Sequence, residues 1–282
     1  MKIDLHTHST ASDGQYSPKD LIDMAIYAKI HFFSITDHDT VQGLVDAEKY
    51  AKVKSLSFVP GIEISTQDLE EIHILGYGID CNNKSLLDAC ATWQNARLNR
   101  GDVIKDYLHT KGIDIDLDEV KSYAVNRSLG RPHFAQYLQN HGIVQTRKEA
   151  FDLYLDTEEF REATDRKKPS PDEAIKLIHG AGGKAVLAHP GIYKMSEIQL
   201  DDLIKRLVDI GIDGIECFYC KHNREQTKRF ISYITAYKLM ISCGSDFHGE
   251  KVKPDVKLGM DFDYEQYGNR LIVNHVQKGI WT

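Results

Sequence analysis

The sequence is poor in several features that define whole classes of protein. Its 282 residues include five cysteines, an odd number that is too small for a disulfide scaffold, so we expect a reduced, cytoplasmic protein. No run of about 18 apolar residues occurs, and Lys2, Asp4, His6 and His8 stand where a signal peptide needs an apolar stretch, so we expect neither a membrane span nor a signal peptide. Basic residues are outnumbered, 35 against 42 acidic ones, and the formal net charge of −7 argues against binding nucleic acid by bulk electrostatics.

Histidine, in contrast, is abundant, with 13 residues in the chain. Histidine is the commonest metal ligand and a frequent acid–base group. The remaining composition, 41% hydrophobic and 27% charged, is ordinary for a globular protein. The positions of the histidines therefore carry the information about function.

The sequence pattern predicts alternating strands and helices in the first and last parts of the chain and only helices in the middle. Two helix starts carry a serine cap followed by proline, at Ser17-Pro18 and Ser170-Pro171. A long helix is predicted over 86–111 and a last one over 264–278, and the stretch 156–168 is charged and poor in apolar residues. The strands are predicted at 2–5, 31–36, 56–64, 71–78, 184–188, 214–218 and 239–243. We therefore predict an α/β barrel in two parts, 1–82 and 169–282, interrupted by a helical insertion domain, 83–168.

Side chains that can bind metal lie at or near the C-terminal ends of the predicted strands. In a parallel α/β barrel these ends converge on one face, where active sites form. Imidazole and carboxylate groups together suit Mn, Fe or Zn, and one ion takes about four to six ligands, so this set implies at least two ions and we expect three. The set consists of His6, His8, Asp13, His38, Glu63, His73, His189, Asp246 and His248.

Each of these signals has a structural alternative when taken alone. His6 and His8 share one face of a strand because side chains alternate with period two, but an HxH pair also arises by chance. A single histidine such as His73 is more often structural. Glu63 stands inside an apolar strand, where a buried carboxylate needs a cation or a metal. The repetition at successive strand ends favours a shared metal basin.

Six short segments resemble the successive signatures of the PHP (polymerase and histidinol phosphatase) superfamily of metal-dependent phosphoesterases. They are DLHTHSTASDG, ITDHD, PGIEIS, HILGYG, AHPG and GSDFHG. The resemblance implies a distorted seven-stranded β/α barrel with a trinuclear metal centre. By this resemblance one metal takes His6, His8, Glu63 and Asp246, a second takes Glu63, His73 and His189, and the third takes Asp13, His38 and His248.

The insertion narrows the resemblance to one group. Its segments NARLNRG and SLGRPHFAQYL, with GIECFYCKHNREQT further on, are similar to bacterial PHP phosphatases that act on 3′,5′-nucleoside bisphosphates or bind AMP. Some members of that group trim RNA from its 5′ end. Histidinol phosphatases are a poorer match in this region.

Four basic residues of the insertion suggest a site for a second phosphate. Arg97 and Arg100 share a helix face, with a solvated surface as the alternative. Arg131 and His133 stand at a helix start, which favours anions, with a salt bridge at the helix entry as the alternative.

Tyr219 and His222 follow a predicted strand end, and we expect them to contact the substrate.

The sequence thus predicts a hydrolase that removes the 3′-phosphate of a nucleoside 3′,5′-bisphosphate such as pAp, or the phosphate of AMP, through metal-activated hydroxide and without a covalent enzyme intermediate. Partners would be the nucleotide, the released phosphate and short RNA 5′ ends, with no membrane. Alternatives are a histidinol-phosphate phosphatase, a 5′-3′ exoribonuclease and a non-catalytic metal-stabilised module that binds nucleotides or a partner protein. The general acid and the oligomeric state stay open. The residues expected to act in catalysis are Asp13, His38, Glu63, His189 and His248.

Overall fold

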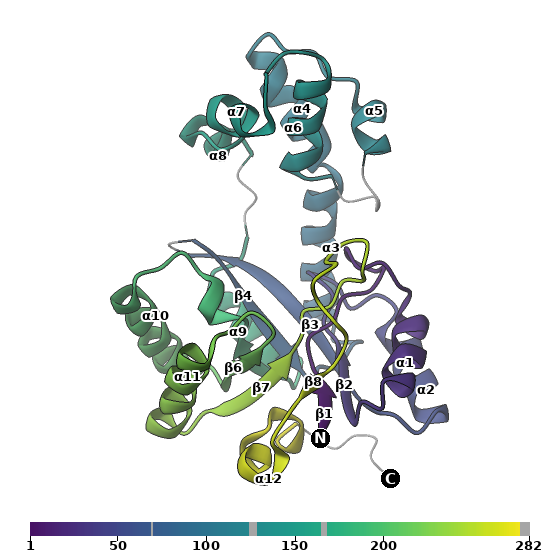
Figure 1. Cartoon of the computed structure of the whole chain (residues 1–282), viewed down its shortest axis with the longest axis vertical. Helices are drawn as coiled ribbons and strands as arrows, with labels where there is room; N and C mark the ends of the chain where they lie inside the picture. The colour runs from purple at the N-terminus through teal and green to yellow at the C-terminus, as the bar shows by residue number, and fades with distance from the viewer. Residues whose placement is uncertain (69, 124–128, 165–167, 277–282) are drawn as a thin grey trace. The chain divides into compact units, whose positions relative to one another are not determined.

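The computed structural model describes residues 1–68, 70–123, 129–164 and 168–276 and divides into two compact units (Figure 1). One unit is made of Met1–Cys90 with Lys168–Thr282, and the other of Ala91–Lys167. None of the helices in these described ranges has the length and apolarity that crossing a membrane requires.

A single eight-stranded sheet forms the core of the first unit, in the order β7-β6-β5-β4-β3-β2-β1-β8. Beyond the paired strands, the Leu5 amide donates to the Cys243 carbonyl at 3.0 Å and the Asp246 amide to the His6 carbonyl at 2.8 Å, which brings the end of β1 against the end of β7. The sheet therefore curls into a nearly closed barrel, which confirms the predicted α/β barrel and adds β8 to the seven strands expected. The strands are β1 (Lys2–Asp4), β2 (Phe32–Ile35), β3 (Ser57–Gln67), β4 (Glu71–Tyr77), β5 (Lys184–Leu187), β6 (Gly214–Tyr219), β7 (Met240–Gly244) and β8 (Met260–Asp261).

Not all of the strands are parallel. β4 runs antiparallel to both β3 and β5, whereas β1–β2–β3 and β5–β6–β7 pair in parallel. The N-terminal end of β4 therefore lies beside the C-terminal ends of its neighbours. His73, expected at the C-terminal end of its strand, is instead the third residue of β4, and the reversal of the strand still brings it to the same rim.

Helices surround the sheet, and their starts follow the capping chemistry read from the sequence. Ser17 caps α1 (Pro18–Tyr27) and Ser170 caps α9 (Pro171–Gly180). In each case the acidic residue three positions on accepts a hydrogen bond from the amide of the serine. α2 (Leu44–Val53) begins directly after Gly43, which adopts a left-handed conformation with φ 82°. The other helices around the sheet are α10 (Glu197–Ile210) and α11 (Arg224–Tyr237).

Two expectations for helices are wrong. The helix predicted over 86–111 is two helices, α3 (Lys84–Leu98) and α4 (Arg100–Thr110), with the poor helix formers Asn99 and Gly101 at the junction. The final helix predicted over 264–278 is only α12 (Tyr264–Tyr267) followed by the 3-10 turns η3 (Gly268–Arg270) and η4 (Ile272–Asn274) in the described residues. Leu271 is extended between the two turns, with φ −68° and ψ 128°, which interrupts the helical path.

The second unit consists of short helices around their own apolar core. Its buried side chains include Ile104, Leu108, Phe134 and Leu138. The charged stretch 156–168 contains a helix that the sequence pattern did not indicate, because a single buried side chain, Phe160, anchors it. After α4 come α5 (Leu117–Ser122), α6 (Arg131–Asn140), α7 (Arg147–Ala150), the π-helix η1 (Phe151–Leu155) and α8 (Glu158–Thr164).

Candidate metal centre

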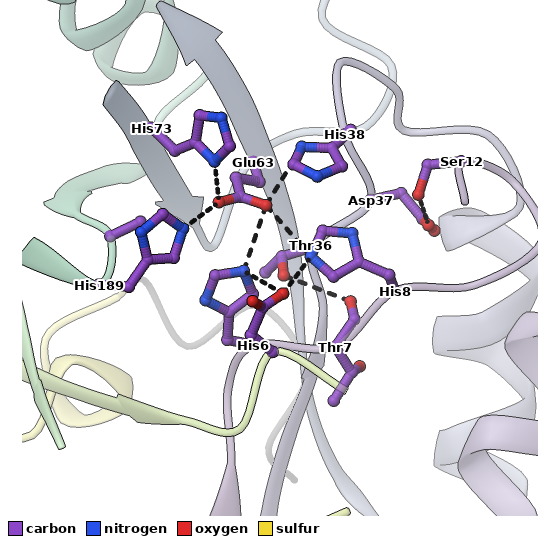
Figure 2. A network of polar contacts seen from close by, with 12 residues as sticks. His6, Thr7, His8, Ser12, Thr36, Asp37, His38, Glu63, His73 and His189 are labelled. Atoms are coloured by element: carbon purple, nitrogen blue, oxygen red, sulfur yellow. Dashed lines mark hydrogen bonds and ion pairs between the residues drawn. The ribbon is translucent and has the colours of Figure 1, made fainter. Parts of the chain in front are cut away.

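Polar side chains converge at the rim where β1, β2, β5 and β7 end (Figure 2). His6 and His8 follow β1 directly and are completely buried, and His38 follows β2. His189 follows β5, and Asp246 and His248 follow β7. The barrel thus gathers side chains from residue 6 to residue 248 in one place.

Three residues next to these strand ends have left-handed backbone conformations that are uncommon outside glycine. Their φ angles are 54° at Asp39, 28° at His189 and 59° at Asp246. Such conformations cost of order 1–3 kcal/mol and persist where the surrounding structure imposes them, most often at functional sites. They turn the chain as it leaves the strand, so that His189 and Asp246 point back over the barrel end.

Glu63, on β3, is the hub of the cluster and is 1% exposed. Its Oε1 lies 2.7 Å from His73 Nδ1 and 3.0 Å from His189 Nε2. Its Oε2 faces the other way, at 3.1 to 3.2 Å from one ring nitrogen each of His6, His8 and His38. The two oxygens of one carboxylate therefore serve two separate sets of histidines, as a carboxylate that bridges two ions would do.

A second concentration of donors surrounds Asp13, in the loop after β1. Asp13 Oδ1 lies 3.3 Å from His248 Nε2, and its Oδ2 lies 3.9 Å from His38 Nε2. Together with His8, these residues present donor atoms that all lie within 4.8 Å of one another. Three further groups with the same spacing are His6–Glu63–His189, His6–His8–Asp246 and His38–Glu63–His73. The structure therefore brings together all nine residues that the sequence assigned to the basin.

Burial and the attraction between carboxylates and imidazoles strongly shift the pKa values of these groups. Burial alone would raise the pKa of the Glu63 carboxyl, but the neighbouring imidazoles, His38 first, hold that pKa well below its usual range. Burial would likewise lower the pKa of His8 and of His73, but the carboxylates around them raise these values to about 9 and about 10. These shifts favour an ionised Glu63 paired with protonated His8 and His73, and a bound cation would displace those protons.

The donor atoms meet without satisfying one another, which is the observation that fits a metal. His6 Nε2, His8 Nε2 and Glu63 Oε2 are buried and have no hydrogen-bond partner among the described residues, although the two ring nitrogens lie 3.2 and 3.1 Å from that oxygen. Buried polar atoms are normally paired, so such atoms in one place need an explanation. Divalent ions that accept imidazole and carboxylate ligands provide one.

Glu216, on β6, belongs to this site and was missed by the sequence reasoning. Its side chain is completely buried, its Oε1 lies 3.0 Å from His6 Nδ1, and its Oε2 accepts a hydrogen bond of 2.7 Å from the His189 amide. A carboxylate behind a metal-binding histidine fixes the ring and its tautomer. The signal was available, because Glu216 interrupts an apolar strand just as Glu63 does.

Two more buried carboxylates hold the loops of the site. Asp37 accepts hydrogen bonds from the Ser9 amide at 2.7 Å and from the Ser12 hydroxyl at 2.5 Å, and so ties the Asp13 loop to the end of β2. Asp4 accepts from the Ser245 amide at 2.9 Å, and burial raises its pKa to about 6.

The two residues after β6 that were expected to contact substrate already have partners inside the protein. The Tyr219 hydroxyl donates to Asp246 Oδ2 at 3.1 Å. His222 Nε2 accepts from the Gly191 amide at 3.0 Å, and its Nδ1 lies 3.2 Å from the Cys217 carbonyl oxygen. Both ring nitrogens of His222 therefore bind backbone groups, and contact of either residue with a substrate stays a prediction.

The basic residues of the insertion lie in the second unit, where Arg131 and His133 contact other residues of that unit. Arg131 begins α6 and pairs with Asp156 at 2.7 Å, which is the salt bridge considered as the alternative. His133 Nδ1 accepts from the Gly130 amide at 3.0 Å, so it caps the same helix. Arg100 is half-buried at the start of α4, and the side chain of Arg97 lies outside the described residues. A role for these four residues in holding a phosphate stays a prediction.

The chain is similar in sequence and in structure to known proteins. The model of the PHP domain family matches residues 4–181. The 5′-3′ exoribonuclease Rnm of Salmonella typhimurium is 34% identical over 251 residues, which cover 87% of this chain and 84% of that protein. The 3′,5′-nucleoside bisphosphate phosphatase of Chromobacterium violaceum is 33% identical over 248 residues, 87% of each chain. A solved structure of a candidate metal-dependent phosphoesterase from Bifidobacterium adolescentis is 29% identical, with a TM-score of 0.74 and coverage of 99% of this chain and 98% of that one.

Proposed function

Because this chain belongs to the PHP domain family and is a hydrolase of phosphoester bonds, we propose that it removes the 3′-phosphate of a nucleoside 3′,5′-bisphosphate or the phosphate of AMP. The observation that carries the metal-dependent chemistry of this proposal is the position of Glu63, whose two oxygens face separate sets of histidines at 2.7 to 3.2 Å. The name of the Chromobacterium violaceum relative supports the nucleotide substrate.

The donor set fits three divalent ions, with Mn, Fe and Zn as the candidates. Glu63 would serve two of them, one on the side of His6 and His8 and one on the side of His73 and His189. Asp13, His38 and His248 would hold the third. Bound ions of this kind neutralise charge on phosphoryl oxygens and lower the pKa of water toward neutrality.

The protein's own contribution to the reaction is to hold these donors in place and in the right protonation state. Glu216 accepts the Nδ1 proton of His6, which leaves Nε2, on the side of Glu63, with a lone pair that could bind an ion. His248 is oriented in the same way, because its Nδ1 lies 2.9 Å from the Asp246 carbonyl oxygen and its Nε2 faces Asp13. Preorganised groups of this kind need no rearrangement when charge develops on the substrate.

A substrate panel tests the proposal. Purified protein with Mn²⁺ is given pAp, AMP, histidinol phosphate and a 5′-phosphorylated RNA, each with and without chelator. We expect chelator-sensitive phosphate release from pAp or AMP at rates well above those for histidinol phosphate. The same assay with Asp13→Ala should show loss of activity with the protein still folded. Phosphate release that survives the chelator, or full activity of Asp13→Ala, would contradict the metal-dependent reaction.

A 5′-3′ exoribonuclease is a second candidate, favoured by the name of the Salmonella typhimurium relative. The RNA in the same panel separates the two functions. Mononucleotide release that begins at the 5′ end, at a rate exceeding phosphate release from pAp, would support the exoribonuclease and displace the phosphatase as the main activity.

A further inference from the structure

The carboxylate of Asp246 presents its two oxygens to different surroundings. Oδ1 lies 3.3 Å from His8 Nε2 and 3.7 Å from His6 Nε2, on the side of the histidines. Oδ2 receives the Tyr219 hydroxyl at 3.1 Å and lies 2.6 Å from the ammonium nitrogen of Lys253. A lysine thus contacts a residue of the basin directly, and neither the sequence motifs nor the mechanism above gives it a role.

The position of Lys253 is set by its backbone. Its amide donates to the Gly249 carbonyl at 2.8 Å, and Gly249 has φ 97°. A side chain at Gly249 would come within 2.4 Å of Gln15, so only glycine allows this close approach. Gln15 in turn accepts from the Lys251 amide at 2.9 Å. The loop that carries Lys253 is therefore tied to the loop that carries Asp13.

We propose that Lys253 is a positioning residue of the metal centre. Its ammonium group holds Oδ2 of Asp246, and it would thereby limit how tightly a metal ion binds to this carboxylate. The inference rests on the proposed role of Asp246 as a ligand. A charge-assisted bond of this length fixes the carboxylate so that Oδ1 alone faces the histidines. A divalent ion bound at this site would compete with the ammonium group for the same negative charge, and the two cations would repel each other.

A purely structural role for this pair is the alternative. The Lys253 side chain is 30% exposed and that of Asp246 is 8% exposed, and loss of one partner leaves a buried charge without compensation. The proposal and a merely structural role predict opposite effects on metal affinity. Loosening of a structural contact weakens metal binding, whereas removal of a competing cation strengthens it.

The test measures Mn²⁺ binding to the metal-stripped full-length protein by isothermal titration, alongside kcat and KM for AMP. The variants are Lys253→Met, which removes the ammonium, and Lys253→Arg, which keeps the charge. Lys251→Met is the matched control, because it removes the same charge from an exposed position on the same loop. We expect Lys253→Met to tighten at least one Mn²⁺ binding step by about threefold or more, with KM unchanged, and the other two variants to stay within about twofold of wild type.

The outcomes separate the inference from the proposed function. Unchanged or weaker Mn²⁺ binding by Lys253→Met, beside normal binding by the wild type, would overturn the inference alone. A KM for AMP raised about fivefold or more would assign Lys253 to substrate binding and overturn it as well. Wild-type protein that binds no Mn²⁺ would overturn the proposed function, and the inference with it.

Discussion

At the scale of single residues, the centre depends on carboxylates that do not themselves face an ion. Glu216 touches both His6 and the backbone of His189, so one side chain fixes two of the proposed ligands. Because all three are buried, the carboxylate cannot be replaced by solvent when it is lost. Its contribution should appear in metal affinity and in stability together.

Replacement of Glu216 by glutamine tests this role. A glutamine keeps the size, but its amide group would place a donor against either the His189 amide or the His6 ring, both of which donate to Glu216. We expect metal affinity to fall by about 10- to 100-fold and the free energy of unfolding to fall by about 1–3 kcal/mol. Mn²⁺ titration and urea unfolding measure the two effects. Glu225→Gln, an exposed change in the first turn of α11, is the control, and equal behaviour of both variants would argue against the positioning role.

At the scale of elements, the turn after β5 is held by the start of α11. The Gly191 amide donates to His222 Nε2 at 3.0 Å, and Gln226 donates to the Gly191 carbonyl at 2.7 Å. A side chain at position 191 would meet the His222 ring at 2.6 Å, so the two segments pack closely there. This contact fixes the turn that carries His189.

The contact should make stability depend on pH. Burial lowers the pKa of His222, so the folded protein holds this ring neutral, and protonation would remove the acceptor for the Gly191 amide. The contribution to stability is complete above the unfolded pKa of about 6.5 and is lost as the pH falls below it. Urea unfolding between pH 7.5 and pH 5 should therefore show a steeper loss for wild type than for His222→Gln. Parallel curves of unfolding free energy against pH for the two proteins would contradict this role of His222.

The start of α6 in the second unit carries a prediction about substrate specificity. Arg131 pairs with Asp156, and its guanidinium lies 5.8 Å from the centre of the Phe151 ring, so it has structural contacts as well as the proposed phosphate role. We expect Arg131→Ala to raise KM for pAp by about tenfold and KM for AMP by much less, as loss of one charge-assisted phosphate contact would do. Steady-state kinetics on both substrates measure it. Asp156→Ala is the control, because it removes the ion pair but keeps Arg131. An equal rise of KM for pAp and AMP in Arg131→Ala would contradict a role of Arg131 in binding the second phosphate.

The same elements show what the sequence could and could not predict. Ser17-Pro18 and Ser170-Pro171 marked helix starts correctly because capping is local chemistry. The reversal of β4 was not readable, because the direction of a strand is decided by its neighbours in the sheet rather than by its own residues. His73 therefore reached the rim for a different reason than the one expected. Glu216 stands out in the sequence as a carboxylate inside an apolar strand, but its role was not readable because its partners, His6 and the His189 amide, follow other strands.

At the scale of the whole molecule, metal and fold are thermodynamically linked. Ions that bind the folded barrel and not the unfolded chain stabilise it, by about 2.7 kcal/mol when free metal is 100 times Kd. Removal of metal with chelator should lower Tm, and excess Mn²⁺ should restore it, as differential scanning calorimetry can measure. The restoration should weaken toward lower pH, because protons compete for rings such as His8 and His73, whose pKa values are raised to about 9 and about 10. A Tm that ignores both chelator and Mn²⁺ would count against a metal centre.

The spread of the donors along the chain, from His6 to His248, also has a consequence for synthesis in the cell. A ribosome delivers the N-terminal donors long before the last ones, and domains form as their sequence emerges. Until His248 has been translated, the set of donors is incomplete. A hydrolase of phosphoester bonds that needs all of these donors would thus remain inactive for most of its own translation.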